Sequence, residues 1–278
     1  MAGTITGSTR VLGIIGDPIA QARSPEVWTG LFRLNGVDAV CVPLQVSPAG
    51  LGAFLDGARA LRNVVGLIVT IPHKAASLPH VASLTERADR VGAVNVIRLT
   101  EGGWHGDTVD GIGFVAGLRR RGHEPAGRRS LVVGVGGAGA AIAFALAEAG
   151  AAEVAVFDLD TERATDVSAR LAATGIASRV APAAAAGFDL VVNASPLGMA
   201  PDDPLPIALD GVDPGCIVGD VVVHPEPTTL LRAAADRGCF TQPGVDMMDG
   251  QIAPMAMFLG LGAGRWDADA VAEVVGER

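Results

Sequence analysis

A lysine at the end of an apolar segment is the first residue in this sequence that could do chemistry. The apolar segment 65–71 is typical of a buried β-strand, and Pro72, His73 and Lys74 follow it. A strand that ends in this way delivers Lys74 into a loop, where its ammonium group can donate a proton to a bound molecule or polarise it. A histidine beside such a lysine more often packs the loop than takes part in chemistry. Taken alone, such a lysine is more often solvated than catalytic, so Lys74 is a candidate whose role depends on the motifs around it.

A glycine-rich turn is the second candidate site. An apolar run leads into Gly134, Gly136 and Gly139, which fit the spacing G-x-G-x-x-G, and an alanine-rich helix follows. Glycines let the backbone turn tightly and approach a pyrophosphate, whose charge is stabilised at a helix N-terminus. Asp158 ends the next strand, where its carboxylate would accept hydrogen bonds from an adenosine ribose, although it could also be an ordinary strand-end cap. The predicted dinucleotide-binding residues of this region are Gly134, Gly136, Gly137, Ala138, Gly139 and Asp158.

The two candidate sites are expected in different domains, because a dinucleotide-binding fold usually opens with its glycine turn. More than a hundred residues precede Gly134, and strands and helices alternate on both sides of it. The near-continuous apolar strands at 188–193 and 216–223 are typical of a parallel sheet covered on both faces. The sequence therefore predicts an α/β fold with an N-terminal open α/β substrate domain and a Rossmann-type dinucleotide-binding domain. Helices are expected after a Ser24 N-cap and at 48–61, 110–121, 138–149, 161–174, 247–259 and 267–277.

Composition excludes several classes of protein. The chain has 278 residues and a net charge of -9, which disfavours a nucleic-acid backbone as partner. No apolar stretch reaches the roughly 18 to 20 residues of a membrane helix, and the N-terminus lacks the apolar stretch of a signal peptide. Cys41, Cys216 and Cys239 have no metal-ligand spacing and suit buried positions in a reducing compartment. We expect a cytoplasmic monomer or homodimer that binds no metal, nucleic acid or membrane.

Motifs along nearly the whole chain resemble those of the shikimate dehydrogenase family. In family order they are Gly16-Asp17-Pro18-Ile19, Arg23-Ser24-Pro25, Val69-Thr70-Ile71-Pro72-His73-Lys74, Gly92-Ala93-Val94-Asn95, Asp110-Gly111, the run 192–199, Asp220 with Pro225, and Gln251. The resemblance implies reversible hydride transfer between a nicotinamide and the C3 position of a hydroxylated cyclohexene carboxylate. It also implies a substrate-binding catalytic domain at 1–109, a dinucleotide-binding domain at 110–243, and C-terminal helices at 244–278 that return to the substrate domain.

The resemblance also assigns roles to individual residues. Lys74 and Asp110 match the family's catalytic pair, in which the carboxylate orients the substrate hydroxyl and the ammonium donates a proton to it or polarises it. Taken alone, Asp110 would be interpreted as a helix cap, and it can serve both as a cap and as a catalytic residue. The implied substrate-binding residues are Ser24, Thr70, Asn95 and Gln251, and the implied cofactor-binding residues outside the glycine turn are Asn193, Ser195, Met199 and Val221.

Five positions, in four motifs, depart from the family's substrate-binding pattern. The first serine of the family's Ser-x-Ser-Pro run is Ala22, and the asparagine of the lysine motif is Ile68. The family's Asn-Thr before the catalytic aspartate is Thr108-Val109, and an expected tyrosine is Val223. Each lost donor should weaken the binding of shikimate by about 1 to 3 kcal/mol. We therefore expect a pocket retuned to a related acid with a different hydroxyl or amino pattern.

The residues after the second strand of the dinucleotide domain favour NAD over NADP. Family members that use NADP usually carry Asn-Arg-Thr there, and the arginine meets the 2′-phosphate. This chain has Asp158-Leu159-Asp160, and two carboxylates would repel a phosphate, whereas Asp158 can accept both ribose hydroxyls of NAD. Arg163 is the one cation nearby in sequence and is expected to face solvent.

Other functions remain open on the sequence alone. One is a sensor or regulator that kept the fold and lost catalysis, which the intact Lys74, Asp110 and glycine turn oppose. A second is another two-domain dehydrogenase, such as a methylene-tetrahydrofolate enzyme, which the Pro-His-Lys and Asp-Gly motifs disfavour. Within the family, the alternatives are a shikimate dehydrogenase, a quinate/shikimate enzyme, and a paralogue acting on aminoshikimate or another analogue.

Overall fold

The computed structural model describes residues 5–200, 202–224 and 226–276, which form two compact units. The first unit extends to Val109 and resumes at Ile252, and the second contains Asp110–Gln251. Helix α9 (Gly244–Gly250), which the sequence grouped with the returning C-terminal helices, packs instead on α5 (Asp110–Arg120) of the second unit. Glycines allow this contact, since a Cβ at Gly250 would lie 2.4 Å from the carbonyl oxygen of Gly113.

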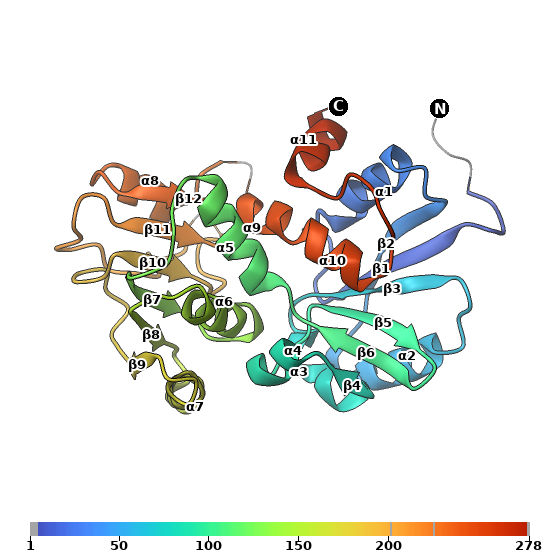
Figure 1. Cartoon of the computed structure of the whole chain (residues 1–278), viewed down its shortest axis with the longest axis horizontal. Coiled ribbons are helices and arrows are strands. Elements are labelled where there is room, and N and C mark those ends of the chain that lie inside the picture. The colour runs from blue at the N-terminus through green and yellow to red at the C-terminus, as the bar shows by residue number, and fades with distance from the viewer. Residues whose placement is uncertain (1–4, 201, 225, 277–278) are drawn as a thin grey trace. The chain divides into compact units, whose positions relative to one another are not determined.

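The first unit is built on a mixed six-stranded sheet with the strand order β2-β1-β3-β5-β6-β4 (Figure 1). Strand β1 pairs in parallel with β2 and β3, whereas β5 is antiparallel to both β3 and β6. The carboxyl ends of β1, β3 and β6 therefore lie at one edge of the sheet, beside the start of β5. The strands are β1 (Arg10–Gly16), β2 (Ala39–Gln45), β3 (Val64–Val69), β4 (Ser83–Leu84), β5 (Val96–Thr100) and β6 (Gly103–Asp107).

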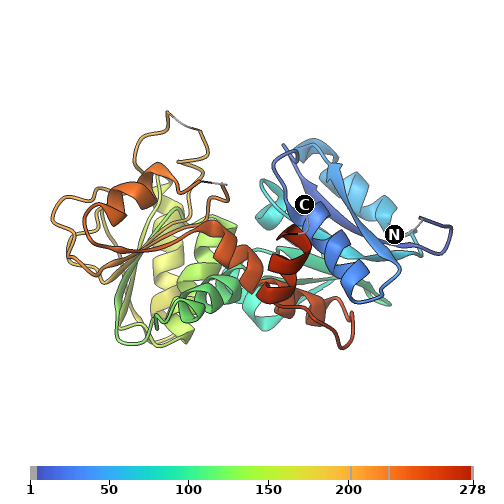
Figure 2. The ribbon, with the colours of Figure 1, turned by 90° about the horizontal axis from the view of Figure 1, so that it is seen from above.

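Helices cover both faces of this first sheet (Figures 1 and 2). On one face, Leu51 and Leu55 pack in a core cluster with Leu67 and Val69 of β3. On the other, the loop after α10 contacts the sheet closely, since a Cβ at Gly66 would lie 2.4 Å from Cδ2 of Leu259. The helices of this unit are α1 (Ser24–Leu34), α2 (Leu51–Ala58), α3 (His73–Ala76), α4 (Glu86–Val91), α10 (Ile252–Phe258) and α11 (Ala268–Gly276), with short 3₁₀ turns at Pro48–Gly50 and Leu78–His80.

The second unit is a parallel six-stranded sheet with the strand order β12-β11-β10-β7-β8-β9. Its central strands are almost wholly buried, which confirms the expected parallel sheet and the Rossmann-type fold class. The chain order reverses between β7 and β10, and ligands of open α/β sheets bind at such a switch point. The strands are β7 (Arg129–Val133), β8 (Glu153–Phe157), β9 (Ala177–Val180), β10 (Leu190–Asn193), β11 (Ile217–Asp220) and β12 (Phe240–Gln242).

Helices also cover both faces of the second sheet. Helix α5 packs on α6 (Gly137–Glu148) and approaches β11, because a Cβ at Gly219 would lie 2.7 Å from the Phe114 ring. On the opposite face, Leu230 and Leu231 of α8 (Thr229–Ala235) share a core cluster with Leu131 and Val218. Helix α7 (Thr161–Ala172) connects β8 to β9.

Three expectations for the helices need correction. Lys74 lies in the single turn α3 rather than in a loop, and α1 begins at Ser24 with Arg23 as its N-cap. The helix expected at 247–259 is two helices, because Pro254 has no N–H to donate to the carbonyl oxygen of Gly250. Two short helices, α4 and α8, were missed although Thr85 and Thr228 cap them. Within the described part of the chain, no helix has the length and apolarity needed to cross a membrane.

Candidate functional site

Lys74 is held at the carboxyl end of β3 by backbone hydrogen bonds. Thr70, the residue after β3, donates its N–H to the carbonyl oxygen of Ile15 (2.9 Å) and accepts the N–H of His73 (2.8 Å). The carbonyl oxygen of Lys74 accepts the N–H of Val94 (3.0 Å). The first unit therefore brings the predicted catalytic lysine and one predicted substrate-binding residue to the same edge of its sheet.

Asn95 lies at this edge as well and is almost fully buried. Its carbonyl oxygen accepts the N–H of Val69 (2.7 Å), and its own N–H donates to the carbonyl oxygen of Asp107 (2.9 Å). Its side-chain Oδ1 accepts the N–H of Val109 (2.9 Å). Asn95 thus links the ends of β3 and β6. Its side chain also holds Val109, the last residue before the chain enters the second unit.

An ion pair between Arg87 and the buried Asp107 stabilises the same edge of the sheet. Asp107 is fully buried and accepts hydrogen bonds from Thr85 Oγ1 (2.5 Å), Arg87 Nε (2.7 Å) and the N–H of Thr108 (2.7 Å). The guanidinium of Arg87 also contacts the second carboxylate oxygen. The sequence analysis assigned Asp107 no role, because its charged partner lies 20 positions away in the chain.

Ser24 belongs to the segment that leaves the same edge after β1. A Cβ at Gly16 would lie 2.6 Å from Cγ2 of Thr70, so this glycine allows the end of β1 to approach the residue after β3. Ser24 begins α1 and is half-buried, as is Ala22, which occupies the position of the missing serine. The structure therefore gathers Thr70, Lys74 and Asn95 around the carboxyl edge of one sheet, and Ser24 belongs to the helix that follows β1.

His73 packs the interior of the first unit. Its side chain is fully buried, and its Nε2 lies 2.7 Å from the carbonyl oxygen of Val46. Because a carbonyl oxygen can only accept, Nε2 carries the hydrogen and donates it. The interpretation of His73 as a packing residue fits this geometry.

Lys74 is also the one lysine in the chain, and every other member of its 21 basic residues is an arginine. An arginine stays protonated at any ordinary pH, whereas a lysine can release its proton and take it up again. The composition therefore singles out position 74 as the one side chain with an amine. The sequence analysis did not use this signal.

Asp110 and Gln251 lie close together in the second unit. Asp110 begins α5 and is 1% exposed. Gln251 follows α9, and a Cβ at Gly113 would lie 2.5 Å from Gln251 Cγ. Gln251 thus packs on α5 one helical turn after Asp110.

The glycine turn has the local geometry that its spacing predicts. Gly134 has a φ of +86° and donates its N–H to the carbonyl oxygen of Phe157 (2.7 Å). Gly136 is the N-cap of α6, and a Cβ at Gly139 would lie 1.8 Å from the carbonyl oxygen of Gly134. Gly137 and Ala138 form the first turn of α6, so their N–H groups lie at a helix N-terminus that can bind a phosphate.

Asp158 is joined to the glycine turn. Its carboxylate accepts the N–H of Val135 (2.8 Å) and the N–H of Asp160 (2.9 Å). Arg163 is exposed, as the sequence predicted, and its guanidinium also lies 3.4 Å from Asp158 and 3.1 Å from Asp160. Leu159 is 89% exposed and carries no charge, at the position where the family resemblance implies an arginine for NADP use.

Asn193 uses its side chain within the protein. It is fully buried, and its Nδ2 donates to the carbonyl oxygen of Leu197 (2.9 Å) and to Asp220 Oδ1 (3.0 Å). Its Oδ1 accepts both the N–H (3.1 Å) and the hydroxyl (2.6 Å) of Ser195. An effect of Asn193 on a cofactor would therefore act through the loop that it holds.

That loop lies against the glycine turn. A Cβ at Gly134 would lie 2.7 Å from the backbone nitrogen of Ser195. Met199, farther along the loop, is 49% exposed. Val221 follows β11 and donates its N–H to the carbonyl oxygen of Asn193 (3.0 Å). The predicted cofactor-binding residues of the second unit thus gather at the carboxyl ends of β7, β8, β10 and β11.

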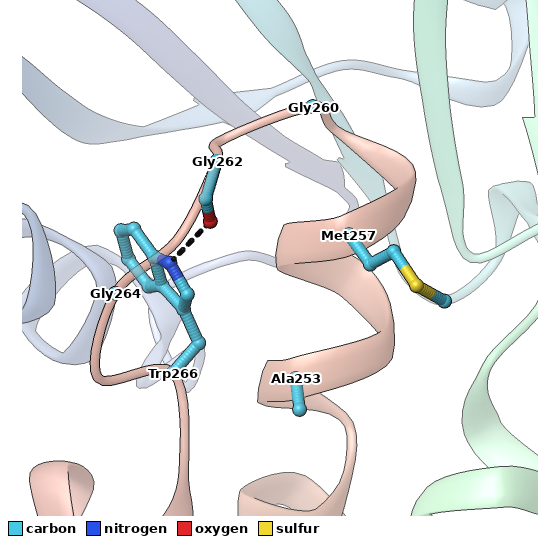
Figure 3. Close-up of a pocket in the computed structure, with 6 residues that line it drawn as sticks. All are labelled: Ala253, Met257, Gly260, Gly262, Gly264 and Trp266. Atoms are coloured by element: carbon cyan, nitrogen blue, oxygen red, sulfur yellow. Dashed lines mark hydrogen bonds between the residues drawn. The ribbon is translucent and has the colours of Figure 1, made fainter.

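A cavity of about 490 Å³ in the first unit does not involve any of these residues (Figure 3). It lies between α10 and the following loop, and Trp266 closes one side by donating its indole N–H to the carbonyl oxygen of Gly262 (3.2 Å). Its lining side chains are apolar and carry no acid or base. The cavity-lining residues are Ala253, Met257, Gly260, Gly262, Gly264 and Trp266.

Sequence comparisons identify related proteins. Residues 14–97 match the family described as the shikimate dehydrogenase substrate binding domain. The shikimate dehydrogenase (NADP(+)) of Rhodospirillum rubrum is 38% identical over 88% of this chain and 89% of its own length.

Solved structures of related proteins have the same fold. Shikimate 5-dehydrogenase from Listeria monocytogenes, in complex with shikimate and NAD, is 27% identical with a TM-score of 0.87 over 99% of both chains. Quinate dehydrogenase from Corynebacterium glutamicum, in complex with NAD, is 30% identical with a TM-score of 0.83 over 97% of this chain and 99% of its own. A ligand-free 5-ketofructose reductase from a Gluconobacter strain is 28% identical with a TM-score of 0.83 over 97% and 98%.

Proposed function

Because the chain belongs to the shikimate dehydrogenase family, it is a nicotinamide-dependent oxidoreductase acting on a CH–OH group, and we propose that Lys74 and Asp110 are its catalytic pair. The observation that carries the proposal is the edge of the first sheet, where Thr70, Asn95 and the one lysine of the chain gather. The substrate is a hydroxylated cyclohexene or cyclohexane carboxylate of the shikimate or quinate type, or an analogue of it.

In the direction of ketone reduction, the carbonyl carbon gains a hydride and the carbonyl oxygen gains a proton. A nicotinamide dinucleotide, held by the glycine turn, would supply the hydride, and the Lys74 ammonium donates the proton. In the direction of alcohol oxidation, the Lys74 amine takes that proton back while Asp110 accepts a hydrogen bond from the substrate hydroxyl and orients it. Ser24, Thr70, Asn95 and Gln251 hold the remaining polar groups of the substrate.

Substitution of the two residues tests their role. Lys74→Ala and Asp110→Asn should each lower kcat by about 100-fold or more while the dissociation constant of the dinucleotide changes little, since general acid–base groups contribute 10²–10⁴. Lys74→Arg is the matched variant, because it keeps the charge but cannot release a proton and should be nearly as slow. Near-normal kcat in Lys74→Ala, or in Lys74→Arg, would refute the mechanism.

The single lysine makes a second, chemical test possible. Reductive methylation with ¹³C-formaldehyde labels lysine amines and the N-terminus, so Lys74 should give the one side-chain dimethylamine resonance in an NMR spectrum. The pH at which this resonance shifts reports the pKa of the dimethylated Lys74 amine. If the protein were instead a sensor or regulator that had lost catalysis, it would bind the dinucleotide but show no turnover with any acid.

We propose that the substrate pocket is retuned away from shikimate. Ile68 lies buried in β3 opposite Val96, and Val109 is fully buried, so neither presents a donor where the family has a polar side chain. Loss of such donors should cost about 1 to 3 kcal/mol each. We expect kcat/KM for shikimate to be lower than for some analogue, and Ala22→Ser with Ile68→Asn to improve it.

A substrate panel decides this proposal. Shikimate, quinate and their amino analogues are the first compounds to assay, and 5-ketofructose joins them because a structural neighbour is a reductase of that ketone. If the unmodified protein uses shikimate with a micromolar KM, better than every analogue tried, the pocket is not retuned.

We propose NAD as the preferred cofactor. Support comes from Asp158 beside the glycine turn, from Arg163 being paired with two carboxylates, and from the uncharged, exposed Leu159. A 2′-phosphate would meet two carboxylates, and Arg163 would have to leave them to bind it.

The test compares kcat/KM for NAD and NADP. Asp158→Asn with Leu159→Arg should shift preference toward NADP, and Leu159→Ala is the uncharged control; wild-type preference for NADP would contradict the proposal.

A further inference from the structure

Asp220 is a buried carboxylate at the end of β11 that receives hydrogen bonds from three segments. It is 1% exposed. Its Oδ1 accepts from Asn193 Nδ2 at the end of β10 (3.0 Å) and from the N–H of Val222 (3.0 Å), and its Oδ2 accepts from Thr228 Oγ1 at the N-cap of α8 (2.7 Å). The sequence analysis quoted Asp220 in a motif but assigned it no role.

Two of the three partners can only donate hydrogen bonds. The amide nitrogen of Asn193 and the N–H of Val222 both point a hydrogen at Oδ1, and the Thr228 hydroxyl can donate to Oδ2. Burial raises the pKa of Asp220, and the hydrogen bonds from Thr228, Val222 and Asn193 counter this by stabilising the charged form. A buried carboxylate is costly unless it is hydrogen-bonded, so these three contacts are what keeps Asp220 at this position.

The hydrogen bonds of Asp220 continue into the loop beside the glycine turn. Asn193 donates one amide hydrogen to Asp220 and the other to the carbonyl oxygen of Leu197, which leaves its Oδ1 to accept from Ser195. Asp220 thereby sets the orientation of the amide that holds the loop. The loop also passes near the carboxylate, since a Cβ at Gly198 would lie 3.9 Å from Asp220 Oδ2.

This loop and Asp158, which is proposed to bind the adenosine ribose, lie on opposite sides of strand β7 in the sheet. Asp158 follows β8, on one side of β7, whereas the loop follows β10 on the other side. A dinucleotide bound across a switch point places its two halves on opposite sides of it. On the proposed function, the adenosine half lies over β8 and the nicotinamide half lies over β10 and β11.

We propose that Asp220 is a positioning residue that, through Asn193, sets the loop 194–199 against which the nicotinamide half of the dinucleotide binds. It does not act on the adenosine half. This inference rests on the proposed function, because it assumes a nicotinamide dinucleotide.

The experiment compares a whole dinucleotide with a fragment of it in the full-length protein. Dissociation constants are measured by calorimetry for the preferred nicotinamide dinucleotide and for ADP, which has the adenosine and pyrophosphate but no nicotinamide. Asp220→Asn removes the charge and replaces one acceptor oxygen by an amide nitrogen. Thr228→Val removes one of the three hydrogen bonds to the carboxylate together with the N-cap hydrogen bond of α8. Thr228→Ser keeps that hydroxyl, and Thr229→Val is the matched control at the neighbouring position, which is exposed on α8.

Asp220→Asn and Thr228→Val should weaken dinucleotide binding by about 10-fold or more, the loss of roughly one hydrogen bond to a charged group, while ADP binding stays within about twofold. Thr228→Ser and Thr229→Val should bind both ligands as the wild type does. If Asp220→Asn does not fold, Thr228→Val still decides the question. Equal weakening of both ligands would mean that Asp220 is structural only, and unchanged dinucleotide binding would exclude the positioning role.

The wild-type protein separates this inference from the proposed function. Binding of the dinucleotide and turnover by the wild type, with no selective effect in the variants, would overturn only the role of Asp220. A wild type that binds ADP but no nicotinamide dinucleotide would overturn the proposed function, and the inference with it.

Discussion

Replacement of Gly139 by alanine is the sharpest perturbation of the glycine turn. The added Cβ would lie 1.8 Å from the carbonyl oxygen of Gly134 and 3.1 Å from the Cβ of Ala194. The first distance is far below any that real Cβ atoms show, and the obstructing atom is backbone, so no side-chain rotation can relieve the contact. The turn and the start of α6 must therefore separate by about 1 Å or more.

This displacement should affect both stability and binding. Overpacking of this kind costs about 1–3 kcal/mol of unfolding free energy. A displacement of about 1 Å at groups that position a ligand can cost on the order of 100-fold, so dinucleotide binding should weaken by roughly that factor. Urea unfolding gives the first quantity, and fluorescence titration with the dinucleotide gives the second.

Two glycines elsewhere provide matched controls. Gly57 is an exposed residue of α2 with open space around its Cβ, so Gly57→Ala should leave binding unchanged and raise stability by about 0.5–1 kcal/mol. Gly136 also has open space and a φ of -66°, so Gly136→Ala should fold normally but bind the dinucleotide less well, because this glycine lets the backbone approach the pyrophosphate. Wild-type stability and binding in Gly139→Ala would refute the reasoning.

Asp107→Ala should lower the free energy of unfolding by about 3–5 kcal/mol, because it leaves Arg87 and two further donors without their buried acceptor, and Asp107→Asn should lower it less; denaturant titration measures both. Glu153 is partly desolvated, but Arg129 and Arg179 outweigh this and hold its pKa below 4.5. Its stabilising effect is therefore complete above that pH and is lost as the pH falls, and Glu153→Gln should flatten the acid limb of a melting-temperature profile. Gly111→Ala should destabilise the second unit, because its Cβ would lie 2.1 Å from the carbonyl oxygen of Ala141; a melting temperature equal to the wild type would contradict the close packing of α5 on α6.

The parts of the site that could be predicted depend on short stretches of sequence. The glycine turn runs over six residues between a strand and a helix, and each glycine meets a local steric need, such as the φ of +86° at Gly134. The Pro-His-Lys motif follows its strand directly, so the position of Lys74 near a strand end could also be predicted. The expected α/β fold class is confirmed, because its apolar strands and their alternation with helices are visible in the sequence.

The partners of the buried polar groups could not be predicted. Asn193 was expected to bind the cofactor, yet its amide is used by Ser195, Leu197 and Asp220. Arg163 is exposed, as expected, but its pairing with two carboxylates was not predicted. In each case residue type shows that hydrogen bonds are needed but not which groups supply them.

Taken alone, the sequence determined the chemistry that each segment offers: an amine at position 74, a glycine turn at 134–139 with the spacing of phosphate-binding turns, and an acid at the end of β8. Backbone preferences and motif spacings decide these features, and both act over a few residues. Only the tertiary structure decided that Asp220 lies next to Asn193, 27 positions away, and that Asp107 pairs with Arg87, 20 positions away. Strand order and helix packing make these pairs, because a buried charge or amide finds its partner among whichever segments the fold brings beside it.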